Sequence, residues 1–240
     1  MKHLTFFLIF ILSAVFVQAQ GIQYGIYTGY GKIFDPGVIE QSELAPSVLA
    51  LQQSTMNTED NIVSLDKSAD YTPMIIQMSY GRIVEGGIKY EFNFSSPQLV
   101  YPISKSDLIG VEEKFRSNSL SLFFRKNSNR CTGIGSYHFF GIEGGKRWGK
   151  KIIEYTDDFK QLDPEAKDVK LNLKSAYFVS LQGGLGYGFS ENFSFELMAF
   201  VSPFNRYQLD NKVDKVNSHR FGIVAGFKFA IDEESFLPCF

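Results

Sequence analysis

The feature that most constrains the fold is an alternation of large apolar residues with small or polar ones, clearest in residues 176–189 (AYFVSLQGGLGYGF). One alternate set runs from Tyr177 to Phe189 and is apolar except at Gly183; the other is small or polar except at Phe178. Successive side chains of a β-strand point to opposite faces, so this period of two predicts a strand with one apolar face. Strands usually have about five or six residues, and this one is much longer. Its apolar face must be covered by a protein core or by lipid.

The same alternation recurs in seven further segments, which gives eight predicted strands. The seven segments are residues 21–31, 73–81, 87–94, 119–126, 132–144, 193–201 and 219–231. Long connections, at 32–72, 95–118, 145–174 and 202–218, alternate with short ones at 82–86, 127–131 and 190–192. An even number of strands with this loop pattern is typical of bacterial outer-membrane barrels, and a closed barrel leaves no unpaired backbone edge in lipid. The sequence therefore predicts an all-β, eight-stranded antiparallel up-and-down transmembrane barrel with four long external loops and short periplasmic turns.

The alternative is a secreted soluble barrel or sandwich, with the apolar face inward and the charged face outward. The alternation itself fits both, but the alternating loop lengths and a glycine-rich polar face favour a membrane barrel. Aromatic residues near the ends of the predicted strands also favour it, because such barrels carry aromatic girdles at both interfaces. These residues are Tyr24, Tyr30, Tyr80, Phe94, Tyr187 and Phe189.

The chain begins with a basic residue, Lys2, followed by an apolar run from Leu4 to Val17 and small residues up to Ala19. Residues 1–19 are therefore predicted to be a signal peptide, since the apolar run is shorter than the roughly 20 residues of a membrane-spanning helix. Residues 20–231 are predicted to form the barrel and residues 232–240 a periplasmic tail. The net charge of −2 argues against nucleic acid as a partner.

Three stretches carry a resemblance to a known family: GIQYGIYTGYG (21–31), GGLGYGFSENFSFEL (183–197) and GIVAGFKFAI (222–231). With them the chain resembles the eight-stranded outer-membrane barrels of Gram-negative bacteria, and within that family the PorT-like group. The resemblance implies an outer-membrane location in the cell envelope. It also implies contact with outer-membrane lipid and other envelope proteins, and a supporting part in a secretion or assembly complex. The chain departs from the family at its end, where Pro238 interrupts the usual C-terminal aromatic strand.

Charged residues on the polar faces of the predicted strands would point into the lumen. They are Lys89, Glu91, Arg125, Glu196, Arg220 and Lys228, accompanied by Gln77 and Gln182. Glu91 is expected to pair with Arg125, and Glu196 with Lys228, because they lie on neighbouring predicted strands. Eight strands enclose a space that side chains just fill, so two hypotheses stay open: a plug of paired charges, and a narrow, porin-like channel for small solutes.

Function is then expected in the external loops, where binding residues usually lie. The first connection, residues 33–72, is acidic, and its middle (45–54) is a candidate helix or lid. The third connection opens with a basic and aromatic motif, KRWGKK, made of Lys146, Arg147, Trp148, Lys150 and Lys151. Such a motif above a membrane strand is suited to lipid phosphates at the headgroup level. The sequence favours a non-enzymatic barrel whose loops bind a partner or ligand.

An enzymatic alternative is a lipid-directed hydrolase using Ser136 and His138, which lie two residues apart and therefore on one face of a strand. No carboxylate is placed to orient the histidine, since Glu143 falls on the opposite face. The sequence has no phosphate-binding glycine loop and no metal-ligand spacing, so no cofactor is expected. Cys131 and Cys239 are the only cysteines, and the predicted topology puts both in the periplasm, where a disulfide is permitted.

Overall fold

The computed structural model describes residues 21–34, 68–95, 98–102, 110–128, 134–162, 164–209 and 216–231. The predicted signal peptide, the tail, most of the first connection and both cysteines lie outside these residues. Almost every described residue is in a strand. The strands are β1 (Ile22–Phe34), β2 (Ser68–Tyr80), β3 (Val84–Ser95), β4 (Gln98–Pro102), β5 (Gly110–Ser128), β6 (Gly135–Tyr155), β7 (Val169–Ser190), β8 (Phe193–Leu209) and β9 (Val216–Ile231). A short helix, α3 (Asp157–Leu162), connects β6 to β7.

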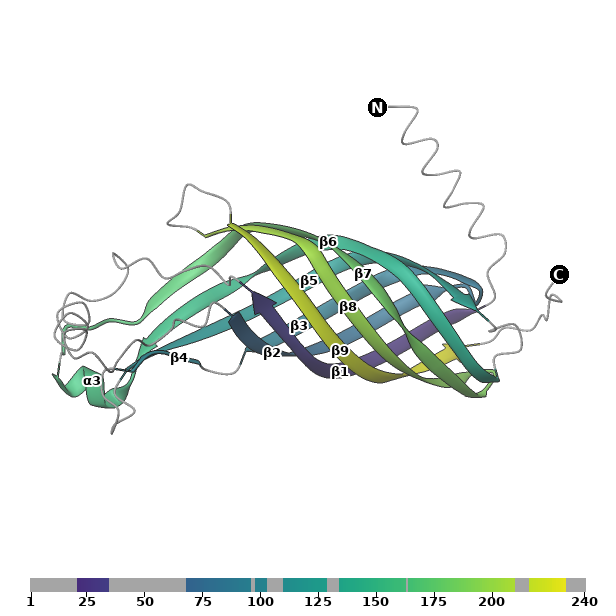
Figure 1. The fold of residues 1–240 in the computed structure, drawn as a ribbon, viewed down its shortest axis with the longest axis horizontal. Coiled ribbons are helices and arrows are strands. Elements are labelled where there is room, and N and C mark those ends of the chain that lie inside the picture. Colours follow the sequence, from purple (N-terminus) through teal and green to yellow (C-terminus); the bar gives the residue numbers. More distant parts are fainter. Residues whose placement is uncertain are drawn as a thin grey trace, which may run out of the picture.

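Eight of these strands form a closed antiparallel barrel, as the sequence predicted (Figure 1). The order is β3-β2-β1-β9-β8-β7-β6-β5, and pairing of β3 with β5 closes the sheet. The first strand, β1, pairs with the last, β9, from Ile22↔Ile231 to Phe34↔His219. The one strand outside the barrel, β4, was not predicted, and among the described strands it pairs with β5 alone.

The register of the strands gives their stagger around the barrel, and with it their tilt. A row of paired residues that starts at Lys146 on β6 returns to β6 at Ser136, ten residues along the strand. The row passes through Leu120, Tyr90, Ile76, Ile26, Phe227, Phe195 and Tyr187. A stagger of ten residues over eight strands corresponds to a strand tilt of about 40°. On β7 the outward side chains from Tyr177 to Tyr187 are apolar and exposed apart from Gly183. At about 3.4 Å per residue and this tilt, these ten residues rise by roughly 26 Å, close to the apolar band of roughly 25 Å of membrane barrels. Ser136 pairs with Tyr187 and Lys146 with Tyr177, so they lie near opposite borders of such a band.

The two ends of the barrel differ. Tight connections, Gly81–Ile83 and Glu191–Asn192, lie at the end where Ile22 meets Ile231. At the other end β5, β6 and β7 run on beyond the barrel with β4 and α3 (Figure 1). We call these the short-turn end and the long-loop end.

The predicted bounds of all four long connections were wrong in part, since β1 extends to Phe34 and β2 begins at Ser68. β5 already begins at Gly110, β6 continues to Tyr155, β7 starts at Val169 and β8 extends to Leu209. The β6–β7 ladder continues past an irregularity between Arg147 and Lys150 as far as Ile153↔Val169. Many side chains here are charged, so the apolar alternation fades although the backbone ladder goes on.

The barrel has its polar residues inside and its apolar residues outside. Outward side chains such as Leu122, Phe140 and Leu185 are 64–68% exposed, while the lumen charges are almost completely buried. A soluble barrel or sandwich has the opposite arrangement, so the burial pattern contradicts that alternative.

Glycines on the inner face make room for aromatic rings. A Cβ on Gly186 would lie 2.2 Å from Cζ of Tyr137, and one on Gly31 would lie 2.2 Å from Cζ of Tyr71. Both tyrosines belong to the buried core of the lumen. The glycine-rich polar face seen in the sequence therefore serves to pack rings flat across neighbouring strands.

Candidate functional site

The six predicted lumen charges, Lys89, Glu91, Arg125, Glu196, Arg220 and Lys228, lie inside the barrel, each at most 2% exposed. They come from β3, β5, β8 and β9, and inward-pointing strand positions bring them together. A buried charge is strongly unfavourable unless it is paired and hydrogen-bonded. Their partners therefore decide whether the lumen is a stable plug.

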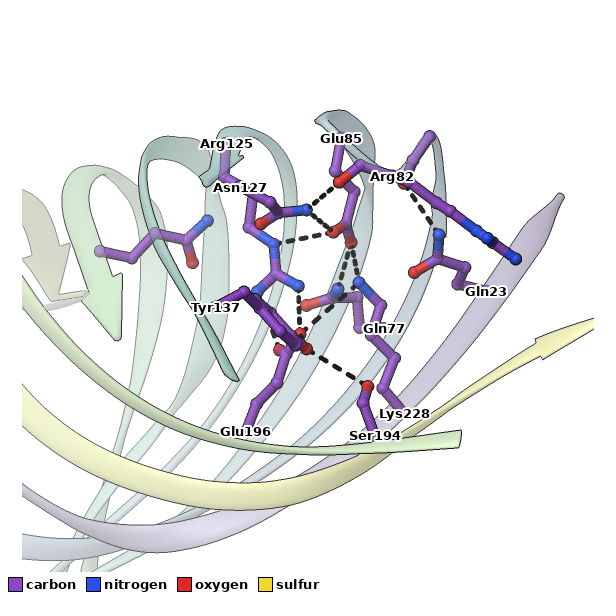
Figure 2. Close-up of polar contacts among 12 residues, drawn as sticks. Gln23, Gln77, Arg82, Glu85, Arg125, Asn127, Tyr137, Ser194, Glu196 and Lys228 are labelled. Carbon is purple, nitrogen blue, oxygen red and sulfur yellow. Dashed lines mark hydrogen bonds and ion pairs between the residues drawn. The ribbon is translucent and has the colours of Figure 1, made fainter. Parts of the chain in front are cut away.

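A first cluster lies near the short-turn end, where the guanidinium of Arg125 sits between Glu85 and Glu196 (Figure 2). Arg125 Nη1 and Nη2 donate to the two oxygens of Glu196 at 2.9 and 2.6 Å, and Nε donates to Oε2 of Glu85 at 2.9 Å. Lys228 Nζ donates to Oε1 of Glu85 at 2.5 Å and lies 3.8 Å from Oε1 of Glu196. Two cations thus offset two carboxylates.

Neutral donors complete this cluster. The hydroxyls of Tyr27 and Tyr137 donate to Glu196 at 2.7 and 2.6 Å. Gln77 and Asn127 donate to Glu85, each at 3.1 Å. The Arg125 guanidinium also stacks over Phe139, 4.2 Å from its ring centroid. Each carboxylate has charged and neutral donors, which is the condition for holding such charges without water.

A second cluster joins Lys89 to Glu143. Lys89 Nζ donates to Glu143 Oε2 at 2.6 Å and to Gln182 Oε1 at 2.8 Å, and Ser121 donates to Glu143 Oε1 at 2.6 Å. Glu143 and Glu85 were not among the predicted lumen charges. Glu85 lay in a predicted turn, but the strict alternation of β6 would have placed Glu143 inside.

A third cluster lies toward the long-loop end and pairs Arg220 with Glu91. Arg220 Nη1 and Nη2 donate to the two Glu91 oxygens, and Nε donates to Ser202 Oγ at 3.4 Å. The predicted pair of Glu91 with Arg125 was therefore wrong. The two residues lie in different clusters at different heights in the lumen.

The basic motif KRWGKK is part of strand β6 and not of a loop, and its residues point in two directions. Arg147 and Lys151 are buried at 2% and 0% exposure, so the structure contradicts a lipid-phosphate contact for these two. Lys146 and Trp148 are exposed, Lys150 is half-buried, and the Trp148 ring lies 6.0 Å from that of Tyr90. Only Lys146, Trp148 and Lys150 remain candidates for lipid phosphate.

The proposed hydrolase pair lies on the outer face. Ser136 and His138 are both exposed, while Glu143 is 3% exposed and points into the lumen. No hydrogen bond joins Ser136 to His138 among the contacts of the described residues. A serine hydrolase needs its nucleophile, base and orienting carboxylate within hydrogen-bond reach, and this arrangement does not provide it.

The connection beyond β6 holds a small exposed network around Asp168. Its Oδ1 accepts the Tyr155 backbone N–H at 3.2 Å and lies 3.0 Å from Lys160 Nζ. Partial burial acts to raise the pKa of Asp168, but the hydrogen bonds from Lys160 and Tyr155 outweigh it and leave the pKa below its usual value. This network ties α3 to the end of β6.

Within the described ranges, no group of three or more His, Cys, Asp or Glu residues is placed to hold a metal ion. No helix in the described part of the chain is long and apolar enough to cross a membrane.

No protein-family model and no curated protein sequence matches the chain. Among solved structures, Neisserial surface protein A (NspA) is similar, with a TM-score of 0.50 and 10% identity over 89% of this chain and 99% of that one. The attachment invasion locus protein Ail of Yersinia pestis has a TM-score of 0.42 and 12% identity, covering 88% and 99%. The outer membrane protein AlkL has a TM-score of 0.44 and 13% identity, covering 91% and 93%. The likeness to NspA shows that the chain has the eight-stranded outer-membrane barrel fold.

Proposed function

We propose that this chain is a non-enzymatic integral outer-membrane protein whose long-loop end faces outward and binds a partner or ligand. The observation that carries the proposal is the reversed burial: apolar side chains cover the outside of the barrel, and charges fill the inside. An apolar outer wall about 26 Å tall is stable in lipid and not in water. Ser136 and His138 lie on the outer face while Glu143 points into the lumen, which supports the non-enzymatic part of the proposal.

The more specific role, a supporting part in an envelope complex, comes from the resemblance to the PorT-like group. The three stretches that resemble the PorT-like group suggest a supporting component of an envelope secretion or assembly complex. The extension of β5, β6 and β7 beyond the barrel gives such a protein a paired sheet to present to neighbouring envelope proteins (Figure 1). Binding sites held on strands are positioned more precisely than those on loops.

The proposal is tested by locating the protein and by its migration in gels. The chain should be recovered from the outer-membrane fraction, and unboiled protein in mild detergent should migrate differently from boiled protein, because a closed barrel stays folded. Recovery as soluble periplasmic protein without a migration shift would refute the membrane barrel.

Outer-membrane lipid is the first proposed partner. Arg116 pairs in register with Lys150, and Lys146 pairs with Tyr177, which in turn pairs with Arg206. With Trp148 these outward residues form a basic and aromatic patch at the long-loop border of the apolar band. Cations and aromatic residues at this level suit lipid phosphates.

This patch is tested with lipid A and its dephosphorylated form in mixed micelles. Replacing Arg116, Lys146 and Lys150 together by Gln should weaken binding of the phosphorylated form only. Lys126 is exposed at the opposite end of β5 and provides the control, since Lys126→Gln should change nothing. Equal binding of both lipids by the wild type would contradict the phosphate role.

A further inference from the structure

Three arginines are fully buried within the described part of the barrel: Arg125, Arg147 and Arg220. Arg125 and Arg220 each have a carboxylate, and all three side-chain nitrogens of each donate a hydrogen bond. Arg147 differs from both, because its one hydrogen bond goes from Nη1 to the amide oxygen of Asn205 at 3.3 Å. Nε and Nη2 of Arg147 have no hydrogen-bond partner among the residues that the structure describes.

The two unpartnered nitrogens form one edge of the guanidinium group. Nε–H and the adjacent Nη2–H point the same way, and their spacing matches two oxygens of a carboxylate or phosphate. Arg147 therefore presents an intact two-pronged donor, held in place on its other side by Asn205. The Phe178 ring, 4.9 Å from the guanidinium carbon, fixes the plane of the group.

The surroundings of Arg147 carry excess positive charge. Arg220 lies against the same Phe178 ring, 5.2 Å from its centroid, and the carboxylate of Glu91 is bound by Arg220. Over the whole length of the described lumen, seven buried cations stand against four buried carboxylates. The cations are Arg82, Lys89, Arg125, Arg147, Lys151, Arg220 and Lys228, and the carboxylates are Glu85, Glu91, Glu143 and Glu196. A buried guanidinium in such a field is strongly stabilised by an anion.

We propose that Arg147 is the centre of a binding site for an oxyanion, a phosphate or carboxylate group, at the long-loop mouth of the lumen. Arg147 follows Lys146, the residue at the long-loop border of the apolar band, and its side chain points inward where that of Lys146 points outward. Nε and Nη2 bind two oxygens of the ligand, and Arg220 adds positive charge. This site makes the proposed ligand-binding function more specific. That the anion approaches from outside the cell rests on that proposed function.

The test is thermal unfolding of the full chain, folded in detergent micelles, with increasing inorganic phosphate and, separately, acetate. Ionic strength is held constant with chloride. A ligand that binds only the folded barrel raises the midpoint of unfolding as its concentration rises. Phosphate or acetate should therefore raise the midpoint in the wild type.

Three variants identify the site. Arg147→Gln should abolish the shift. Arg147→Lys keeps the charge but loses the two-pronged donor, so binding should weaken by at least about tenfold, the loss expected for one charge-assisted hydrogen bond. Lys126→Gln removes a charge from an exposed residue at the short-turn end of β5 and should behave like the wild type.

The proposal is overturned if neither anion shifts the wild-type midpoint, a result that does not depend on whether any variant folds. It is also overturned if Arg147→Gln keeps the full shift. In both cases a protein that still shows a boiled-versus-unboiled migration shift leaves the membrane-barrel proposal intact, so the two proposals fail separately.

Discussion

At the scale of single residues, the lumen is held together by charges that bond across it. Arg125 on β5 reaches Glu196 on β8, Lys89 on β3 reaches Glu143 on β6, and these strands are not neighbours in the barrel. The sequence identified six of the inward charges, because that depends only on the period of two, but it missed Glu85 and Glu143. It paired Glu91 with the wrong cation, because it considered only neighbouring strands, whereas a narrow lumen brings opposite walls within reach of long side chains.

Glu196 accepts four hydrogen bonds, two of them from Arg125, so its loss should be costly. Glu196→Gln leaves the buried Arg125 without one carboxylate and should lower the free energy of unfolding by about 3–5 kcal/mol. Urea unfolding in lipid vesicles measures this. Glu191→Gln, the same change in the tight β7–β8 turn, should have little effect, and equal losses in the two variants would contradict the role of the cluster.

Gly186 should tolerate no larger residue, because Tyr137 lies across it. Gly186→Ala forces the Tyr137 ring, and with it the hydrogen bond to Glu196, to move, at a cost of about 1–3 kcal/mol. A Cβ on Gly183, on the same strand, would lie 3.5 Å from its nearest neighbour, so Gly183→Ala should be nearly neutral. The same urea series compares the two variants, and a neutral Gly186→Ala would refute this packing.

At the scale of elements, the sequence predicted the eight membrane-band strands but not their extensions. An alternation of apolar and polar residues is required only where one face of a strand meets lipid. Beyond that band, β5, β6 and β7 continue to pair with one another and carry charged residues on both faces. Arg147 and Lys151 were assigned to a loop for this reason. The alternation of Lys146, Arg147 and Trp148 contained the signal that one of them points inward.

The β6–β7 connection should loosen in acid. The pKa of Asp168 is lowered in the folded protein, so its stabilising contribution is complete above the usual aspartate pKa of about 3.9 and is lost as the pH falls through the lowered value. Hydrogen exchange of the Tyr155 amide should accelerate, beyond the intrinsic pH effect, only below that range. Asp168→Asn should remove this pH dependence, and an unchanged profile in the variant would contradict the assignment.

At the scale of the whole molecule, the paired charges and inward aromatic rings describe an anchor with a filled lumen more closely than a channel. The sequence left these two functions open, because side-chain contacts across the lumen cannot be counted from strand patterns. The structure adds the contacts, and it leaves Arg147 as the one fully buried arginine of the described barrel without a carboxylate.

A filled lumen should not conduct. Purified protein in planar lipid bilayers should show no steady single-channel current, because small ions would have to break the clusters around Glu85, Glu143 and Glu91 in turn. Discrete openings in the wild type would favour the narrow channel instead. A boiled sample, carried through the same steps, controls for contaminating pores.

Whether the apolar outer face of the barrel meets lipid is tested most directly by the depth of one tryptophan in the bilayer. Trp148 is the only tryptophan of the chain, and Ile142, 50% exposed, lies between Ser136 and Lys146 near the middle of the apolar band. In vesicles, the variant carrying Trp148→Phe and Ile142→Trp should be strongly quenched by lipids brominated in mid-chain, and the wild type much less. Strong mid-chain quenching would show that this face of the barrel lies in the bilayer interior. If the variant fluoresces unquenched in the same vesicles, the outer face does not meet lipid, and the membrane barrel is wrong.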